Sequence, residues 1–296
     1  MLQLPANDLT GQPHYQPVPA PPSQVDNLSW PALPDPDEFV RIHVLDSGVN
    51  RQQQWLQQRH WGDSEPDQVD TDEDGRRDDA AGHGTFVAGI ITRLASYATV
   101  RVLDVLDGRG WVSEEAVAHR IDELPAANIL NLSFGGFTYR NRPPELLKRA
   151  ILHWLDRNPG SVVVAAAGNT SVGRRFWPAA MRRVIAVAAV DRLARPADFT
   201  NYGTDDDRWV DACALADNVQ STFITFPPDA APRDDAFHGW ANWSGTSFAA
   251  PVVVAAIARR MQASGYTITP EQAWRQLSAG KPSIVHDGKY VGTLID

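Results

Sequence analysis

Cysteine, excess positive charge and long apolar runs are all scarce in this 296-residue sequence. Its one cysteine, Cys213, cannot form an internal disulfide and has no cysteine partners for a zinc site. The 27 Lys and Arg residues are outnumbered by 36 Asp and Glu. The resulting net charge of -9 argues against a nucleic-acid partner, because phosphate binding depends on basic residues. No apolar run is long enough to span a bilayer, so we expect no membrane partner.

Signals for secretion and for a catalytic metal are also missing. The first residues contain no basic region, no apolar stretch and no small-residue cleavage site. The sequence therefore predicts a cytoplasmic protein, with a secreted chain that has lost its leader as the alternative. The eight histidines show no HExxH motif and no closely paired spacing, which disfavours a metalloenzyme.

Proline is concentrated at the N-terminus, where nine of the 22 prolines lie within residues 5–36. Proline fixes φ and lacks an N–H donor, so this stretch cannot form a helix or a central strand. We predict that residues 1–38 form an extended arm with Tyr15, Trp30 and Leu33 as candidate anchors. A flexible linker and a docked arm are both compatible with this composition.

From residue 40 onward, short apolar runs alternate with amphipathic segments. Runs of β-branched and apolar residues between amphipathic helices indicate strands that are buried on both faces. We expect strands at 41–46, 100–106, 129–134, 161–167 and 184–190, and helices at 84–94, 113–124, 145–155 and 247–261. This order predicts an α/β fold with a doubly wound, mainly parallel sheet and helices on both faces, within one domain of residues 39–296. After residue 191 the pattern predicts irregular loops and a short, polar C-terminal region.

Four segments place a chemically useful side chain beside small residues at the expected strand ends and helix starts. Asp46 ends a strand, His83 begins a helix, Asn169 follows an apolar strand, and Ser247 begins an apolar helix. Each also has a common structural role, such as a turn aspartate, a buried histidine or a helix N-cap. Active-site groups of a parallel sheet gather beyond the carboxyl ends of its strands.

Together these side chains indicate nucleophilic acyl transfer. Ser247 would attack, His83 would accept its proton, and Asp46 would orient and stabilise the imidazole. The amide of Asn169 and the backbone N–H of Ser247 would hold the oxyanion. The chain order is Asp, His, Ser, which differs from the Ser-Asp-His order of α/β-hydrolases.

These residues lie in motifs that resemble those of the subtilisin-like serine proteases, the subtilases. The motifs follow in the family's order and cover roughly residues 40–265: Asp46-Ser47-Gly48, Gly82-His83-Gly84-Thr85, Ala166-Ala167-Gly168-Asn169 and Gly245-Thr246-Ser247-Phe248-Ala249-Ala250-Pro251. The resemblance implies that Asp46, His83 and Ser247 form the triad and that Asn169 is the oxyanion donor. It also implies a peptide or protein substrate and no cofactor for the chemistry.

The resemblance further implies that the substrate lies extended between two backbone segments. The matching stretches here are Gly108-Arg109-Gly110 and Ser133-Phe134-Gly135. Exposed strand edges of this kind bind a peptide main chain by strand addition. Arg174 and Arg175 lie in a stretch that in this family borders the first specificity pocket, where they would either favour an acidic residue or simply lie on a surface loop.

The N-terminal arm departs from the pattern of secreted subtilases, which carry a folding prodomain. About 38 proline-rich residues are too few for one, and the layout is closer to that of intracellular members. An extended arm can fill a peptide-binding groove, and its X-Pro bonds are poor substrates. We expect residues 1–38 to lie across or beside the cleft and to restrain activity.

An acidic insert just before His83 is a second departure. Its residues Asp70, Asp72, Asp74 and Asp78 match positions of an EF-hand-type loop, although the twelfth position is Ala81 rather than glutamate. Clustered carboxylates repel one another without a cation, which favours structural calcium. A solvated acidic surface loop is the alternative.

The sequence thus predicts a serine endopeptidase that acts through an acyl-enzyme. One alternative is a processing or macrocyclising peptidase, in which the same triad passes the acyl group to an amine. Another is a catalytically silent peptide-binding module that uses the same groove. The sequence does not specify the natural substrate, the activation trigger or the oligomeric state.

Overall fold

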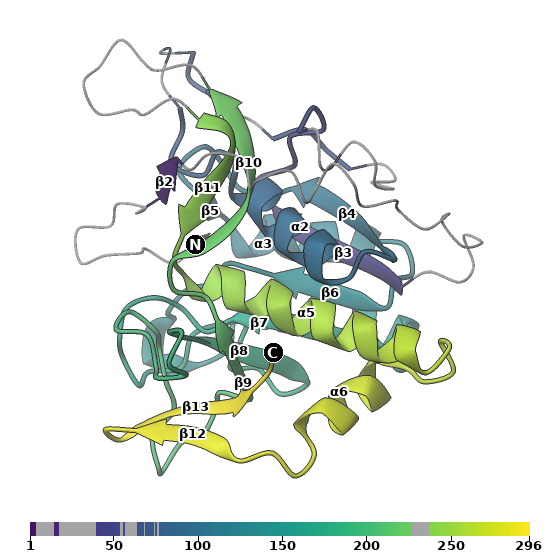
Figure 1. The fold of residues 1–296 in the computed structure, drawn as a ribbon, viewed down its shortest axis with the longest axis vertical. Helices are drawn as coiled ribbons and strands as arrows, with labels where there is room; N and C mark the ends of the chain where they lie inside the picture. The colour runs from purple at the N-terminus through teal and green to yellow at the C-terminus, as the bar shows by residue number, and fades with distance from the viewer. Residues whose placement is uncertain are drawn as a thin grey trace.

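A computed structural model describes residues 1–3, 15–17, 40–53, 56, 64–67, 69–73, 75, 77–226 and 237–296. A sheet of eight strands runs through the middle of the molecule (Figure 1). Its order is β12 (Ser283–His286), β13 (Lys289–Leu294), β9 (Ala212–Leu215), β8 (Val184–Val190), β7 (Val162–Ala166), β6 (Ile129–Leu132), β3 (Val40–Asp46) and β4 (Ala98–Asp104). All neighbouring pairs are parallel except β12 with β13.

Helices cover both faces of this sheet. On one face lie α2 (His83–Leu94), α5 (Thr246–Ala263) and α6 (Pro270–Ser278), and on the other lie α3 (Glu114–Glu123) and α4 (Glu145–Arg157). Figure 1 shows α5 laid across the central strands, with α2 beside it. The predicted doubly wound, mainly parallel α/β fold is confirmed.

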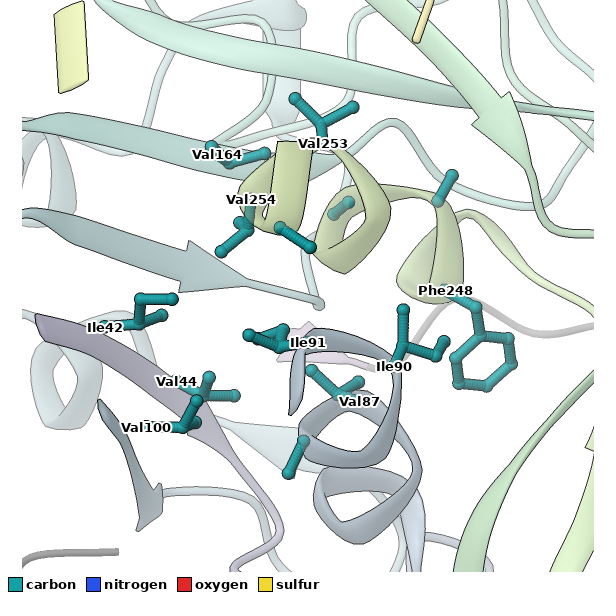
Figure 2. Close-up of a cluster of buried hydrophobic side chains, with 14 of the residues drawn as sticks. Ile42, Val44, Val87, Ile90, Ile91, Val100, Val164, Phe248, Val253 and Val254 are labelled. Carbon is teal, nitrogen blue, oxygen red and sulfur yellow. The ribbon is translucent and has the colours of Figure 1, made fainter. Parts of the chain in front are cut away.

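The strands divide their side chains between two apolar cores. In β7, Val162 and Val164 join the core under α2 and α5, whereas Val163 and Ala165 join the core under α3 and α4. This alternation follows from the two-residue period of a strand, and it explains why the central strands β7 and β8 are apolar throughout. Figure 2 shows the first core, where Ile42 and Val44 of β3 face α2 and α5.

Two smaller sheets lie outside the main sheet. The hairpin of β10 (Val219–Phe226) and β11 (Phe237–Trp243) is extended by β2 (Tyr15–Pro17), all antiparallel. β1 (Leu2–Gln3) pairs with β5 (Trp111–Val112), and a 3-10 turn, η2, spans Tyr139–Asn141. Of the predicted arm anchors, Tyr15 lies in β2, and Trp30 and Leu33 lie outside the described residues.

The region after residue 191 is more regular than the sequence predicts. Besides the predicted helix, which is α5, it contains β9, the β10–β11 hairpin, α6 and the β12–β13 hairpin. The C-terminal residues are not merely polar surface, because β13 pairs in parallel with β9 and Val291 is fully buried. Within the described residues, no helix combines the length and apolar character needed to cross a membrane.

Candidate active site

Asp46 and His83 are brought together by a strand end and a helix start. Asp46 is the last residue of β3, His83 is the first of α2, and His83 Nδ1 lies 2.7 Å from Asp46 Oδ1. Both side chains are buried, and the Ser47 N–H also donates to Asp46 Oδ1 at 2.8 Å. Because a carboxylate only accepts hydrogen bonds, Nδ1 of His83 is the donor and Nε2 keeps its lone pair. The ring is therefore arranged to act as a base through Nε2.

A close backbone contact holds these two segments together. A Cβ on Gly84 would lie only 2.1 Å from the carbonyl oxygen of Gly48, so a larger residue would force loop and helix apart. The Gly84 N–H also donates to Ser47 Oγ at 3.1 Å. The glycines beside Asp46 and His83 thus allow the 2.7 Å contact between the two side chains.

Two aromatic side chains pack against the imidazole of His83. Trp243 of β11 meets the ring edge-on with the centroids 5.3 Å apart, and Phe248 of α5 lies at the same centroid distance. Both aromatic side chains are almost fully buried. Since Phe248 directly follows Ser247, this packing fixes the imidazole beside the start of α5.

Ser247 is held by Ser133 at the start of α5. Its Oγ donates to the Ser133 carbonyl oxygen at 2.9 Å. Pro251, one turn later, has no N–H to donate to the carbonyl of Ser247, and Ser133 Oγ donates to that carbonyl instead at 2.9 Å. The side chain of Asn131 in turn donates to Ser133 Oγ at 2.9 Å. The proline in the helix and the serine after β6 are therefore parts of one arrangement.

Asn169 is oriented by the residue before Ser247. Its Oδ1 accepts from both the N–H and the Oγ1 of Thr246, at 2.8 and 2.7 Å. A backbone N–H can only donate, so Oδ1 must face Thr246 and the amide nitrogen must face away from it. The Ser247 N–H lies in the first turn of α5, where N–H groups have no acceptor within the helix. These are the two donors predicted for an oxyanion.

Gly135, from one predicted substrate segment, pairs with β1. The Gln3 N–H donates to the Gly135 carbonyl at 2.8 Å, and the Gly135 N–H donates back to Gln3 at 2.9 Å. Ser133 and Phe134 precede Gly135 in the same segment, and the side chain of Phe134 is fully buried in the core. The segment therefore presents its backbone, rather than the Phe134 side chain, to an extended chain.

The other predicted segment lies on the opposite side of β1. Gly108, Arg109 and Gly110 form the turn before β5, and Leu2 of β1 pairs with Val112 of β5. The strand contact thus falls just after the predicted residues rather than on them. The turn itself is fixed by Asp107, whose carboxyl accepts the N–H groups of Arg109 and Trp111 at 3.1 and 2.7 Å.

A second carboxyl group, Asp67, contacts the residues on both sides of His83, and no local pattern in the sequence distinguishes it. It accepts hydrogen bonds from the Gly82 N–H at 3.0 Å and from Thr85 Oγ1 at 2.8 Å, and so links the residues on both sides of His83. Loss of hydration raises the pKa of Asp67 to about 8, the hydrogen bonds oppose this, and the negative charge of Asp46 adds to it. Asp67 differs from the other acidic residues of this region only in its position, within hydrogen-bonding distance of the start of α2.

The raised pKa of Asp67 makes its contribution to stability dependent on pH. Between its ordinary value of 3.8 and about 8, the folded chain keeps a proton that the unfolded chain releases, so stability falls as pH rises through this window. Asp67→Asn mimics the protonated form and should remove that slope. We expect the melting temperature of the wild type to fall relative to Asp67→Asn between about pH 5 and pH 8.

The measurement is thermal denaturation of both proteins on a Ser247→Ala background, which prevents self-cleavage. Comparing the two proteins cancels other titrating groups, such as His43, whose pKa burial lowers to about 4. Parallel curves across the whole range would contradict the prediction.

Two carboxylates of the acidic insert accept hydrogen bonds from within the insert. Asp78 Oδ2 accepts from the N–H and Oγ1 of Thr71 at 2.8 and 2.6 Å, and Asp70 Oδ2 accepts from the Gly75 N–H at 3.0 Å. Asp74 lies outside the described residues. In the part of the chain that is described, no three acidic, histidine or cysteine side chains are grouped as metal ligands.

Arg174 and Arg175 are engaged on the protein itself. The Arg175 guanidinium makes a two-point ion pair with Asp207, at 2.8 and 2.7 Å. The Arg174 guanidinium lies 4.9 Å from the ring centroid of Phe137 and donates to the Thr138 carbonyl. This arrangement fits the surface-loop alternative better than recognition of an acidic substrate.

Comparison with known proteins agrees with this geometry. A family model described as the subtilase family matches residues 38–281. A thermophilic serine proteinase from Bacillus sp. (strain AK1) is 36% identical over 202 residues, which are 63% of this chain and 44% of that relative. Subtilisin BL from Lederbergia lenta is 31% identical over 231 residues, 74% of this chain and 75% of the relative.

Solved structures show the same fold. The prenylagaramide maturation protease PagA superimposes with a TM-score of 0.67 at 22% identity, covering 87% of this chain and 90% of that one. At this level of identity the match concerns the fold alone. The chain spans less than half of the Bacillus proteinase, at 44%, but about three quarters of subtilisin BL, at 75%.

Proposed function

The chain belongs to the subtilase family and is a subtilisin-like serine endopeptidase, and we propose that Asp46, His83 and Ser247 form its catalytic triad. The observation that carries this assignment is the buried 2.7 Å contact between Asp46 and His83, with the residue after Ser247 packed on the same imidazole ring. The end of β3, the start of α2 and the start of α5 thereby meet at one place.

The first chemical step transfers a proton from Ser247 to His83. The Ser247 hydroxyl, which donates to the Ser133 carbonyl in this conformation, turns about its Cα–Cβ bond toward Nε2 of His83. As its oxygen attacks the scissile carbonyl carbon, Nε2 takes the proton and Asp46 stabilises the imidazolium. The imidazolium then protonates the leaving amine, and water releases the acyl group by the reverse sequence.

The oxyanion formed in each step would be held by Asn169 and by the Ser247 N–H. The Thr246 contacts to Asn169 Oδ1 support this role, because they leave the amide nitrogen as the group that faces the other way. A donor that is fixed before the reaction costs no reorganisation when charge develops.

The assignment is tested by covalent labelling with a fluorophosphonate, followed by mapping of the labelled peptide. We expect the label on Ser247 and none on a Ser247→Ala variant. A chain that is never labelled would fit the silent binding module, and label on another serine would overturn the assignment.

A processing role uses the same triad and differs in the fate of the acyl group. The fold similarity to the maturation protease PagA fits this alternative without favouring it over hydrolysis. The two are separated by the mass of the product, because hydrolysis adds one water to the cleaved chain and cyclisation adds none.

We propose that the N-terminal arm restrains activity by placing Leu2 and Gln3 in the substrate groove. Gln3 makes both backbone hydrogen bonds of an antiparallel pair with Gly135, and β5 lies on the other side. In an antiparallel pair, moving forward along the substrate means moving back along the Ser133–Gly135 segment. A substrate in this register therefore has one residue opposite Gly135, and the residue two positions later lies opposite Ser133, next to Ser247. The chain has Pro5 at the corresponding sequence position, which suits a segment that is bound but not cut.

Removal of the arm should therefore raise activity on a peptide substrate. The side chain of Leu2 is 3% exposed, and burial of a leucine is worth about 1.5–3 kcal/mol. We expect a truncation that begins at Asp37, and the full-length Leu2→Asp variant, to show roughly 10- to 100-fold higher kcat/KM. Leu193→Asp, at a side chain that is 72% exposed, is the control and should change nothing. Equal activities of the full chain and the truncation would remove the proposal.

The calcium site made of Asp70, Asp72, Asp74 and Asp78 stays a prediction. It is supported by the density of carboxylates in a loop that leads directly into the helix of His83. Such an ion would stabilise the loop and take no part in the chemistry.

A further inference from the structure

Two glycines flank the place where the substrate side chain next to the scissile bond must go. The residue whose carbonyl carbon Ser247 attacks, here called the acyl residue, would have its carbonyl oxygen at Asn169 and its backbone along the Ser133–Gly135 segment if the proposed roles hold. Its side chain therefore starts between that segment and Gly168, which directly precedes Asn169. The two segments run side by side because β6 and β7 are neighbours, with Leu132 paired to Ala165.

The ring of Phe176 lies in this space. A Cβ on Gly135 would lie 2.4 Å from Phe176 Cε1, and a Cβ on Gly168 would lie 3.0 Å from Phe176 Cγ. The ring thus touches the backbone on both sides of the gap. Phe176 is 3% exposed, so other atoms of the protein already surround the ring.

Backbone hydrogen bonds and ring packing also hold Phe176 in place. Trp177 exchanges both backbone hydrogen bonds with Gly136, at 2.9 and 2.8 Å, which ties residue 176 to the end of the substrate segment. The Phe176 carbonyl accepts from the Ala180 N–H at 2.9 Å, and the ring packs edge-on against Phe137 with centroids 5.2 Å apart. To leave the gap, the ring would have to break this packing.

We propose that Phe176 is the specificity-determining residue of this protease and restricts the acyl residue to small side chains, namely glycine, alanine and serine. The inference rests on the proposed catalytic role of Ser247 and Asn169. A small acyl side chain fits beside the ring, whereas a leucine or phenylalanine side chain would occupy the same space. Arg174 and Arg175 do not offset this restriction, since their guanidinium groups are held by Thr138 and Asp207.

The test compares peptides that differ only in the acyl residue, which is alanine, leucine or phenylalanine, as competing substrates of the full-length protein. Competition gives ratios of kcat/KM that do not depend on how much enzyme has its groove occupied. One methylene changes such ratios by about 10- to 200-fold, so we expect the wild type to prefer alanine over phenylalanine by at least about 100-fold. Phe176→Ala should reduce that ratio by at least about tenfold.

Two further variants keep the test decisive. Phe176→Leu preserves most of the packing and should admit leucine but not phenylalanine as the acyl residue, which decides the matter if Phe176→Ala fails to fold. Tyr139→Leu removes an aromatic side chain that is 84% exposed, and it should keep the wild-type ratio.

Fluorophosphonate labelling of each variant separates the two proposals. Labelled wild type that cleaves after phenylalanine as readily as after alanine would overturn the role of Phe176 and leave the triad intact. A labelled Phe176→Ala or Phe176→Leu variant with an unchanged ratio would do the same. Absence of labelling throughout would instead contradict the proposed function.

Discussion

Ser247→Ala should lower kcat by about 10⁶-fold, the loss found when the catalytic serine of a subtilisin is removed. The variant removes the hydroxyl that would form the acyl-enzyme, while binding and the oxyanion donors remain. The fold should survive, because the Ser247 hydroxyl makes one hydrogen bond, to the Ser133 carbonyl, and such a bond contributes about 1 kcal/mol. Single-turnover hydrolysis of a peptide, measured against the thermal stability of the same sample, checks both parts.

Ser244→Ala provides the matched control. Ser244 lies three residues earlier, accepts from the Asn218 N–H at 2.8 Å and donates to Asp217 at 2.9 Å, so its hydroxyl is committed to the neighbouring loop. Its loss should leave kcat within about tenfold of the wild type. Hydrolysis that persists at the wild-type rate in Ser247→Ala would mean that another group is the nucleophile.

The proposed catalytic residues could be predicted from the sequence because each one interrupts a simple local pattern. Asp46 is an acid at the buried end of β3, and Ser247 lies in the first turn of a helix rich in small apolar residues. Burial of such polar groups is costly unless they have partners, so a local pattern already indicated that partners exist. What those partners are depends on residues that are distant in the chain.

The distant contacts carry no local signal of that kind. Pro251 in α5 leaves the Ser247 carbonyl without a helical donor, but nothing in the sequence indicates that Ser133 supplies one. Asp67 lies among many acids, and Phe176 resembles any buried aromatic residue until Gly135 and Gly168 are seen to pack on it. In the same way, the parallel pairing of β13 with β9 joins Thr293 to Ala212, a contact that no local periodicity encodes.

Asp46→Asn should lower kcat by about 10⁴-fold, the order found when the triad aspartate of a subtilisin is removed. Here the structure specifies how the loss arises. Asp46 Oδ1 accepts from the Ser47 N–H as well as from His83 Nδ1, and a backbone N–H cannot accept in return. The asparagine must therefore keep its oxygen toward both donors, and the imidazole keeps its tautomer. The variant loses the negative charge that stabilises the imidazolium, not the orientation of the ring.

The neighbouring strand offers the control for this charge. Asp104 ends β4 directly beside Asp46, and Asp104→Asn removes the same charge one strand away from His83. If direct contact with the imidazole is what matters, kcat should fall about 10⁴-fold for Asp46→Asn and less than about tenfold for Asp104→Asn. The rate of fluorophosphonate labelling should follow kcat in both variants, because the probe needs the same proton transfer. Similar losses in the two variants would mean that the net field of the strand ends, rather than one hydrogen-bonded carboxylate, supports the charge on His83.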